Sequence, residues 1–374
     1  MPRILHTADW QIGRQYSRFA AEDAAVLSEA RFAAIERIAE LAVEHNCDAV
    51  LVAGDVFDAQ TVSDRVIHRT FNAMQGFTGP WILLPGNHDA ALVESVWTRA
   101  RRLEAVPGNV VLALESGVIE LAEQGMAVLA APLVQRHTYD DLTAAFDALD
   151  TPESLLRIGL AHGSVQGVLA EDIDSANPVA EDRVQSARLD YLALGDWHGS
   201  KQINPRCWYS GTPEPERFRN NDAGNVLLVE IEARGAEPRV TTLPTARYQW
   251  LQWQRQLAVA SDLDEFLREL EQVPADSVLD IALAGSINLA DEERLERALA
   301  KAAGRLRSLQ CDTSDLSIAP TDEDIAALGA DGYLGEVVED LRQRQSDDDK
   351  TARDALLILA GLLRDRETAG DVRQ

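Results

Sequence analysis

Two spacings of apolar residues alternate along residues 1–235. Short runs of β-branched residues and leucine predict buried strands, and longer segments with an apolar residue every three or four positions predict amphipathic helices. Phe32, Ile35 and Ile38, for example, recur at helical spacing after the first strand. The predicted helices cover residues 22–46, a segment that begins after Ser63 or Asp64, and residues 91–104.

Strands that alternate with helices in this way form largely parallel sheets, with helices over both faces. The predicted fold class is therefore α/β. Strands near 109–131 and 205–231 follow one another without long helices between them, which indicates antiparallel pairing. This pattern favours a second sheet that packs against the first.

The pattern changes near Pro244, where a small α+β module is predicted to begin. Its elements are strands at 247–257, 277–284 and 306–311 and helices at 262–272 and 291–304. Beyond Pro320 the chain is charged and helical, over 322–345 and 349–366, and the last helix carries an apolar stripe of Ala355, Leu356, Leu359, Leu362 and Leu363. Such a tail either packs on its own domain or docks a partner. The predicted domains are 1–240, 245–318 and 320–374.

The chain is strongly acidic, with a formal net charge of -27 over 374 residues. Proteins that act on nucleic acid usually show a basic region, so this charge counts against such a substrate without excluding one. The densest acidic runs lie in the last third of the chain, at 262–265, 291–293 and 347–349. They are predicted to be solvated faces away from the candidate site.

The sequence predicts a cytoplasmic protein that has no membrane segment. Cys47, Cys207 and Cys311 are far apart and odd in number, which is typical of reduced thiols. The longest apolar stretch, 356–363, is much shorter than the roughly 20 residues that cross a bilayer. Pro2 and Arg3 lead directly into a strand, without the pattern of a signal peptide.

Five of the predicted strands end at residues that are common metal ligands. In an open α/β sheet, ligands collect just beyond the carboxyl ends of the strands. These strand ends would therefore bring Asp, Asn and His side chains to one rim, which is a place to hold two metal ions. The polar residues at the five ends are Asp9; Asp55 and Asp58; Asn87, His88 and Asp89; His162; and Asp196 and His198.

This ordered set of motifs resembles the calcineurin-like metallophosphoesterase superfamily, and within it the SbcD-type DNA repair nucleases that work with SMC-like ATPases. The resemblance covers residues 1–235, and the α+β module looks like that family's capping domain. The segment 209–214 (YSGTPE) and the strand 226–231 resemble the strands that follow the last motif. The resemblance implies a two-sheet αββα-type sandwich with a small α+β capping domain and a C-terminal helical tail.

The resemblance also implies a role for each motif residue. Asp55 would bridge two divalent ions. Asp9, Gln11 and His198 would complete the first ion's ligands, and Asn87, His162 and Asp196 would complete those of the second ion. His88 would face the scissile phosphate and protonate the leaving oxygen, Asp89 would orient the His88 ring, and Asp58 would orient neighbouring groups.

Two positions depart from the family pattern. The first motif usually reads Asp-x-His, but here Gln11 follows Asp9-Trp10; the last usually reads Gly-His-x-His, but here Asp196 precedes Trp197-His198. An amide oxygen is a poor substitute for imidazole, so the first ion would be held loosely. The full set of carboxylate, imidazole and amide ligands favours Mn²⁺, or Mg²⁺, over Zn²⁺.

Residues near the motifs are candidates for substrate binding. Arg14, Tyr16 and Arg18 follow the first motif on a loop that is either simply solvated or positioned to contact a phosphate backbone. Trp197 either walls the site or stacks on a base. Arg217 and Arg219 are weaker candidates. His6 is predicted to be a buried, hydrogen-bonded residue and not a ligand.

The leading functional hypothesis is a dinuclear metal nuclease that acts on DNA, as a 3′→5′ exonuclease with some single-strand endonuclease action. Polarity and substrate come from the resemblance alone. The alternatives are a phosphoesterase for a small molecule, and a weakly catalytic scaffold for DNA ends or an ATPase, which the changes at Gln11 and Asp196 motivate. The resemblance further implies an SMC-like coiled-coil ATPase partner and a homodimer formed through helices near 62–104.

Overall fold

The computed structural model describes residues 1–167, 176–219, 221–318 and 333–346, with a few more between 351 and 359. The chain divides into two compact units, Met1–Gln249 and Trp250–Gln374. Each unit has a hydrophobic core of its own. The candidate site lies entirely within the first unit.

Two six-stranded sheets form the first unit, in the orders β14-β13-β1-β2-β3-β4 and β11-β12-β10-β7-β6-β5. In the first sheet, β1 to β4 are parallel, and β13 and β14 add antiparallel pairs on one side only. In the second sheet, β6, β7, β10 and β12 are parallel, and the edge strands β5 and β11 pair antiparallel. The first sheet comprises β1 (Arg3–Thr7), β2 (Ala49–Ala53), β3 (Trp81–Leu84), β4 (Val110–Leu112), β13 (Asn225–Glu230) and β14 (Arg239–Pro244). The second comprises β5 (Gly117–Leu121), β6 (Met126–Ala131), β7 (Leu156–His162), β10 (Tyr191–Gly195), β11 (Lys201–Asn204) and β12 (Cys207–Tyr209).

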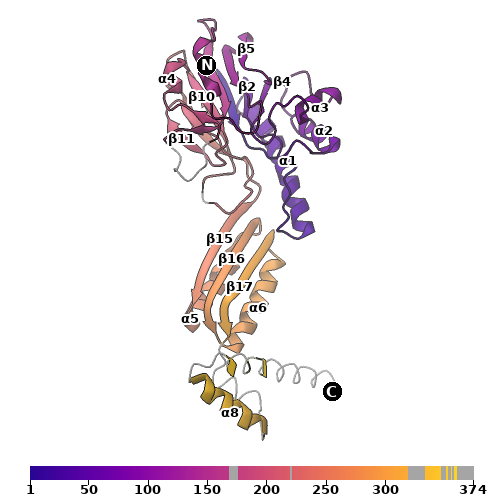
Figure 1. The fold of residues 1–374 in the computed structure, drawn as a ribbon, viewed down its shortest axis with the longest axis vertical. Coiled ribbons are helices and arrows are strands. Elements are labelled where there is room, and N and C mark those ends of the chain that lie inside the picture. The colour runs from indigo at the N-terminus through magenta and orange to yellow at the C-terminus, as the bar shows by residue number, and fades with distance from the viewer. Residues whose placement is uncertain are drawn as a thin grey trace. The chain divides into compact units, whose positions relative to one another are not determined.

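The alternation of side chains along β2 explains the layering. Leu51 points to a core shared with Ile158 and Leu160 of the second sheet, while Val50 and Val52 point to a core shared with the helices. Figure 1 shows three helices on one side of the sandwich and α4 on the other. These helices are α1 (Ala21–Glu44), α2 (Asp64–Ala73), α3 (Val96–Arg102) and α4 (Arg183–Ser186), with short 3₁₀ turns at Ala122–Gln124 and Leu142–Ala148. The predicted two-sheet sandwich is confirmed.

The third helix is shorter than predicted. It was expected over 91–104, but α3 begins only at Val96, because Ser95 caps it by accepting a hydrogen bond from the Thr98 amide. The preceding residues take a different path, and the amide of Ala91 donates to the carbonyl of Leu133. Apolar spacing alone could not separate this loop from the helix that follows it.

The second unit is a three-stranded sheet in the order β15-β16-β17, with α5 and α6 packed on it. The elements are β15 (Gln249–Leu257), α5 (Ala260–Gln272), β16 (Ser277–Ile287), α6 (Leu289–Ala303) and β17 (Ser308–Ile318), followed by α8 (Tyr333–Ser346). β17 runs past the predicted end at 311 because β16 offers it a parallel partner as far as the Ile287–Ile318 pair. Most of the predicted helix 349–366 and its apolar stripe lie outside the described residues.

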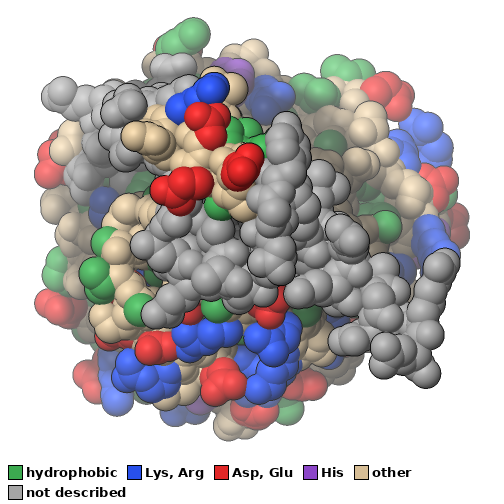
Figure 2. Space-filling model, turned by 90° about the horizontal axis from the view of Figure 1, so that it is seen from below, with side chains coloured by type: hydrophobic (Ala, Val, Ile, Leu, Met, Phe, Trp, Pro, Cys, Tyr) green, Lys and Arg blue, Asp and Glu red, His purple; other side chains and the backbone are tan. Residues whose placement is uncertain are grey.

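Ion pairs partly neutralise the acidic runs at 262–265 and 291–293 and the nearby Glu271. Arg294 pairs with Asp264 and with Asp291, and Lys301 pairs with Glu271. On the face shown in Figure 2, basic side chains lie beside acidic ones. Among the described residues on that face, acidic and basic side chains are therefore interspersed. None of the helices in the described part of the chain combines the length and the hydropathy that crossing a bilayer would require.

His6 joins the two sheets of the first unit from the inside. Its Nδ1 lies 2.9 Å from the hydroxyl of Tyr191, and its Nε2 lies 3.1 Å from the carbonyl oxygen of Leu194. The ring is fully buried, as predicted. Burial lowers the pKa of His6 to about 3, so the ring is neutral in the folded protein.

A neutral buried His6 makes stability depend on pH. Since the pKa of His6 falls from 6.5 to about 3 on folding, the unfolded state binds more protons below pH 6.5. Stability is fully present above that pH and is lost on acidification, by about 1.4 kcal/mol per pH unit from this group. Urea unfolding at several pH values should show that the free energy of unfolding falls less steeply on acidification in His6→Asn than in the parent. An NMR titration in which the His6 ring protonates between about pH 5 and about pH 8 would contradict this prediction.

Candidate metal centre

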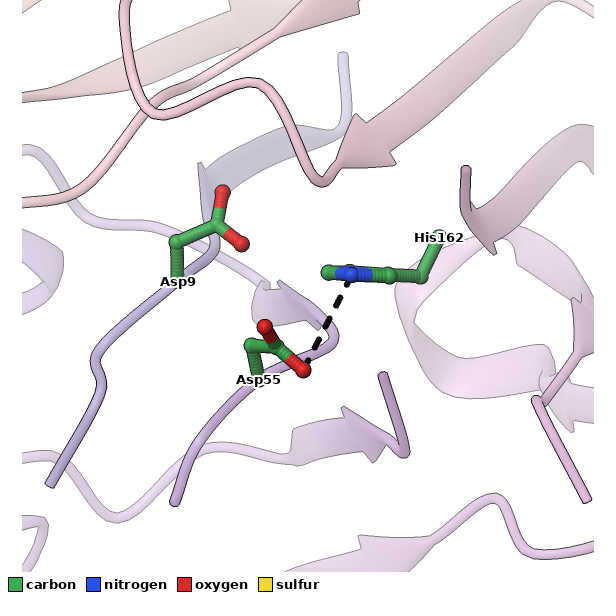
Figure 3. A group of neighbouring side chains, drawn as sticks. All are labelled: Asp9, Asp55 and His162. Carbon is green, nitrogen blue, oxygen red and sulfur yellow. Dashed lines mark ion pairs between the residues drawn. The ribbon is translucent and has the colours of Figure 1, made fainter. Parts of the chain in front are cut away.

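The polar residues at the strand ends converge at one rim of the sandwich. Asp9 follows β1, Asp55 follows β2, Asn87 follows β3, and His162 ends β7. The ligand atoms of Asp9, Asp55 and His162 all lie within 4.8 Å of one another. Figure 3 shows the two carboxylates and the imidazole turned toward a common space. Since all three side chains are buried, this space is screened from bulk water.

Four residues of the site have a backbone conformation that non-glycine residues rarely adopt. Asp9, Gln11, Asp55 and Asp196 have φ angles of 54°, 50°, 53° and 100°. Such conformations cost on the order of 1–3 kcal/mol each and persist only where the surrounding structure imposes them. Here the loops after β1 and β2 hold each other, through amide-to-carbonyl hydrogen bonds of 3.0 Å from Asp9 to Gly54 and 2.9 Å from Gln11 to Asp55. The strain aims the side chains inward.

Two glycines let the strand ends approach this closely. A Cβ at Gly86 would lie 2.2 Å from Oδ1 of Asp55, and one at Gly195 would lie 1.9 Å from the carbonyl oxygen of Ala53. Both contacts are too short for any side chain. The glycines therefore allow the turns after β3 and β10 to lie directly against the loop that carries Asp55.

His162 presents one ring nitrogen to the site. Its Nδ1 lies 2.8 Å from the carbonyl oxygen of Ala53, which can only accept, so Nδ1 carries a proton and, when the ring is neutral, Nε2 has the free lone pair. That Nε2 lies 3.0 Å from Oδ1 of Asn87, 3.8 Å from Asp55 and 3.7 Å from Asp196. A ring held in this way by a backbone carbonyl is typical of a metal ligand.

The amide of Asn87 lies among acceptors. Its Oδ1 faces Nε2 of His162 and both carboxylate oxygens of Asp55. If the amide were rotated by 180°, its nitrogen would donate to Nε2 of His162 at 3.0 Å and to Oδ2 and Oδ1 of Asp55 at 3.0 and 3.2 Å. A cation between these atoms would satisfy them without turning the amide. The buried Oε1 of Gln11 also has no hydrogen-bond partner among the described residues, while its Nε2 donates to Asp55 at 2.8 Å. These unpaired oxygens fit a divalent cation.

His198 is held from behind by a residue that the sequence reasoning missed. The Nδ1 of His198 lies 2.6 Å from Oε1 of Glu216, which is buried. The turn that carries His198 is fixed next to Asp9, because the amide of Asp196 lies 3.2 Å from both carboxylate oxygens of Asp9. The last recognisable motif segment ends at Glu214, and no spacing rule connects His198 to a glutamate in the loop after β12, two strands further along the chain.

The expected orientation of His88 needs a correction. Its Nδ1 lies 2.8 Å from the backbone carbonyl oxygen of Asp58, and its Nε2 lies 4.0 Å from Asp55. Asp89 does not hold the ring: its buried carboxylate accepts the amides of Phe57 at 3.0 Å and Gly86 at 2.7 Å. Asp89 thus ties the loops after β2 and β3 together through backbone amides. The ring is oriented by the backbone of Asp58.

The loop after the first motif is more tightly packed than expected. Arg14 forms ion pairs with Asp58 at 3.3 Å and with Glu216 at 2.9 Å. Tyr16 was a candidate for contact with a phosphate backbone, but it is only 5% exposed and its hydroxyl accepts a hydrogen bond from Arg31. It packs beneath the loop.

The other two substrate-binding candidates are more accessible. Arg18 is exposed and lies over the ring of Phe218 at 4.5 Å. Trp197 is partly buried against the core of the second sheet, with Lys201 over its ring at 5.1 Å. Part of its ring is therefore covered by protein.

When no cation is bound, the environment of the cluster raises the pKa values of His162 and Asp9 and so favours their protonated forms. Burial opposes protonation of His162, but Asp55, Asp9 and Asp196 outweigh it and raise its pKa to about 9. Burial likewise raises the pKa of Asp9 to about 6. These shifts follow from placing several carboxylates in a buried space, where an added positive charge is strongly favoured.

Comparisons with known proteins agree with this geometry. Residues 2–228 match the family described as calcineurin-like phosphoesterase. The DNA double-strand break repair protein Mre11 of Methanosarcina acetivorans is 25% identical over 391 residues, which cover 97% of this chain and 58% of that protein. The D subunit of the nuclease SbcCD of Rhodobacter capsulatus is 29% identical over 295 residues, which cover 65% of this chain and 69% of that protein.

Among solved structures, TT1561 of Thermus thermophilus aligns with a TM-score of 0.42 and 13% identity, over 65% of this chain and 99% of that one. By the 58% coverage given above, the chain spans a little over half the length of the Mre11 relative from Methanosarcina acetivorans.

Cation binding should release protons and should tighten as the pH rises. His162, with a pKa near 9, is protonated at neutral pH in the cation-free protein and must lose that proton to coordinate. Affinity should therefore increase from about pH 6 to about pH 9, and calorimetry in two buffers with different ionisation enthalpies should detect proton release. Equal affinity across this range, without proton release, would contradict the assignment of His162 as a ligand.

Replacing Gln11 by histidine should tighten cation binding at the first position. Because an imidazole is a stronger ligand than an amide oxygen, we expect affinity to rise by about tenfold, which corresponds to roughly 1.4 kcal/mol. The measurement is a Mn²⁺ titration of the parent, of Gln11→His, and of Gln15→His, a control at an exposed position of the same loop. If the Gln11→His isotherm matches that of the parent, residue 11 does not reach the cation.

Proposed function

We propose that this chain, which belongs to the calcineurin-like phosphoesterase family, is a metal-dependent nuclease. Its reaction would be the hydrolysis of phosphodiester bonds in DNA. One observation carries the proposal above all: buried acceptor atoms from both sheets converge beside His88, whose side chain is 30% exposed. Relatives named as a DNA double-strand break repair protein and as part of a nuclease support DNA as the substrate.

The proposal assigns two cation positions that share Asp55. Asp9 and His198, with Gln11 beside them, would hold the first cation, and Asn87, His162 and Asp196 would hold the second. When bound, two dications supply Lewis-acid activation of a phosphoryl oxygen, activation of a water molecule, and stabilisation of the negative charge that develops during displacement. The carboxylate and amide ligands favour Mn²⁺, with Mg²⁺ as the second choice.

His88 is proposed as the general acid. Because its Nδ1 donates to the carbonyl of Asp58, its Nε2 is the nitrogen that can hold a transferable proton. As water attacks phosphorus and the bond to the leaving sugar oxygen breaks, Nε2 would give its proton to that oxygen. A contribution of this kind is typically about 10²–10⁴-fold in rate.

Basic side chains next to the centre support binding of a phosphate backbone. The loop after β1 and the segment after Pro215 lie together, since Arg18 stacks on Phe218 and Arg14 pairs with Glu216. Arg217 and Arg219 extend from the same segment, and Arg219 is exposed. Backbone contacts of this type position nucleic acid without reading its sequence.

Other parts of the proposal rest on resemblance to the relatives. We propose 3′→5′ exonuclease action with some endonuclease action on single strands, and a cytoplasmic location. One relative is named as a single subunit of the nuclease SbcCD, and such a name implies a larger assembly. On that ground we propose an SMC-like coiled-coil ATPase partner that docks on 320–374, and a homodimer formed through helices within 62–104.

The test is digestion of end-labelled linear DNA with Mn²⁺, Mg²⁺ or Co²⁺, and with chelator. The parent should degrade DNA with Mn²⁺ and stop when the metal is removed. His88→Ala should lower turnover by about 10²–10⁴-fold while the content of bound metal stays unchanged, because His88 is placed beside the cations and not among their ligands.

Other results would select the alternatives. Hydrolysis of a small phosphodiester without cleavage of any DNA would favour a small-molecule phosphoesterase. Metal binding without hydrolysis of either substrate would favour a weakly catalytic scaffold. Loss of bound metal in His88→Ala would show that the role of His88 is misassigned.

A further inference from the structure

The carboxylate of Glu216 is buried and surrounded by positive or proton-donating groups. Its side chain is 1% exposed. Oε1 lies 2.6 Å from Nδ1 of His198, and Oε2 lies 2.9 Å from Arg14 and 3.6 Å from the buried Arg31. Arg217 completes the set, donating to Oε1 through its Nε at 2.7 Å. These positive neighbours offset much of the cost of burying the charge, although Oε2 has ion-pair contacts and no hydrogen bond within the described residues.

These partners determine how His198 is protonated. Arg14 and Arg31 lie at Oε2 of Glu216 and Arg217 lies at Oε1, and this positive charge on both oxygens favours the ionised carboxylate. An ionised carboxylate can only accept, so the 2.6 Å contact favours a proton of the neutral ring on Nδ1 over a hydrogen bond from Nη2 of Arg217, which lies 3.2 Å from the same nitrogen. The lone pair of His198 is then on Nε2, the nitrogen on the far side of the ring from Glu216.

The same carboxylate is also connected to the His88 side of the site. Arg14 lies between Glu216 and the side chain of Asp58, at 2.9 Å and 3.3 Å. The backbone carbonyl of Asp58 in turn accepts from His88. Arg14 therefore braces the loop that orients His88 against the segment that orients His198.

We propose that Glu216 is a positioning residue, which fixes the tautomer and the direction of His198 so that Nε2 is presented to the first cation position beside Asp9. The inference rests on the proposed cation binding, but not on DNA as the substrate. Removal of a carboxylate that backs a metal-ligating histidine typically costs about 10–100-fold in metal affinity. The loss should fall on one of the two cations, because His162, proposed for the second position, is held by the carbonyl of Ala53 instead.

Three variants of the full-length chain test the proposal. Glu216→Gln keeps a carbonyl acceptor for Nδ1 but removes the charge, and Glu216→Leu removes both. Glu214→Gln is the matched control: Glu214 is equally buried in the same segment, but its carboxylate accepts the amides of Arg247 and Tyr248 and does not contact His198. Mn²⁺ affinity is measured by calorimetry, and the tautomer of His198 by ¹⁵N NMR of the cation-free protein, with the signal assigned by its loss in His198→Gln.

Glu216→Leu should bind one cation about 100-fold more weakly than the parent and lose the Nδ1–H tautomer. Glu216→Gln should keep the tautomer, because its carbonyl still accepts from Nδ1, but should bind that cation about tenfold more weakly than the parent, because the charge is gone. Glu214→Gln should bind both cations as the parent does. Parent-like binding in both Glu216 variants would overturn the proposal, and so would an equal loss in Glu214→Gln. If Glu216→Leu does not fold, Glu216→Gln decides alone, and affinity identical to the parent overturns the proposal.

These readouts separate the inference from the proposed function. If the parent cuts no DNA but Glu216→Gln weakens Mn²⁺ binding, the nuclease proposal fails and the role of Glu216 stands. If the parent cuts DNA and Glu216→Gln binds Mn²⁺ unchanged, the role of Glu216 fails alone. A parent that binds no divalent cation overturns both.

Discussion

The main constraint on this structure is the close approach of carboxylate and amide oxygens to an imidazole nitrogen at one buried rim. Oxygens of Asp55, Asn87 and Asp196 lie 3.0–3.8 Å from the free ring nitrogen of His162, and the carboxylate of Asp9 is close by. In a buried space this arrangement is repulsive unless positive charge lies between the groups. Protons supply some of that charge when no metal is bound, and divalent cations would supply it with a geometry suited to hydrolysis.

Much of the surrounding fold maintains this unfavourable arrangement. Asp9 and Asp55 adopt left-handed backbone conformations that the interlocked loops after β1 and β2 impose. Each imidazole is held on its other side by a different acceptor: the carbonyl of Ala53, the carboxylate of Glu216 or the carbonyl of Asp58. The site is thus organised in advance, and a cation need not reorganise the protein in order to bind.

The sequence was sufficient to predict which residues would meet, but not how each would point. Apolar runs that stop at Asp or His predict strand ends, and parallel strands bring those ends to one rim, so Asp55 and His162 could be placed together. The backing roles could not be predicted, because a backbone carbonyl leaves no trace in the sequence and Glu216 reaches His198 only through the packing of a loop. The burial of Tyr16 and the late start of α3 were missed for a similar reason: local pattern does not reveal tertiary contacts.

The central claim is that this rim holds two cations on a shared carboxylate. Electron paramagnetic resonance of chelator-treated protein titrated with Mn²⁺ tests it most directly. The account predicts two Mn²⁺ per chain with an exchange-coupled spectrum, as expected for ions about 3.5–4 Å apart. A signal from isolated Mn²⁺ that saturates at one ion per chain would contradict it.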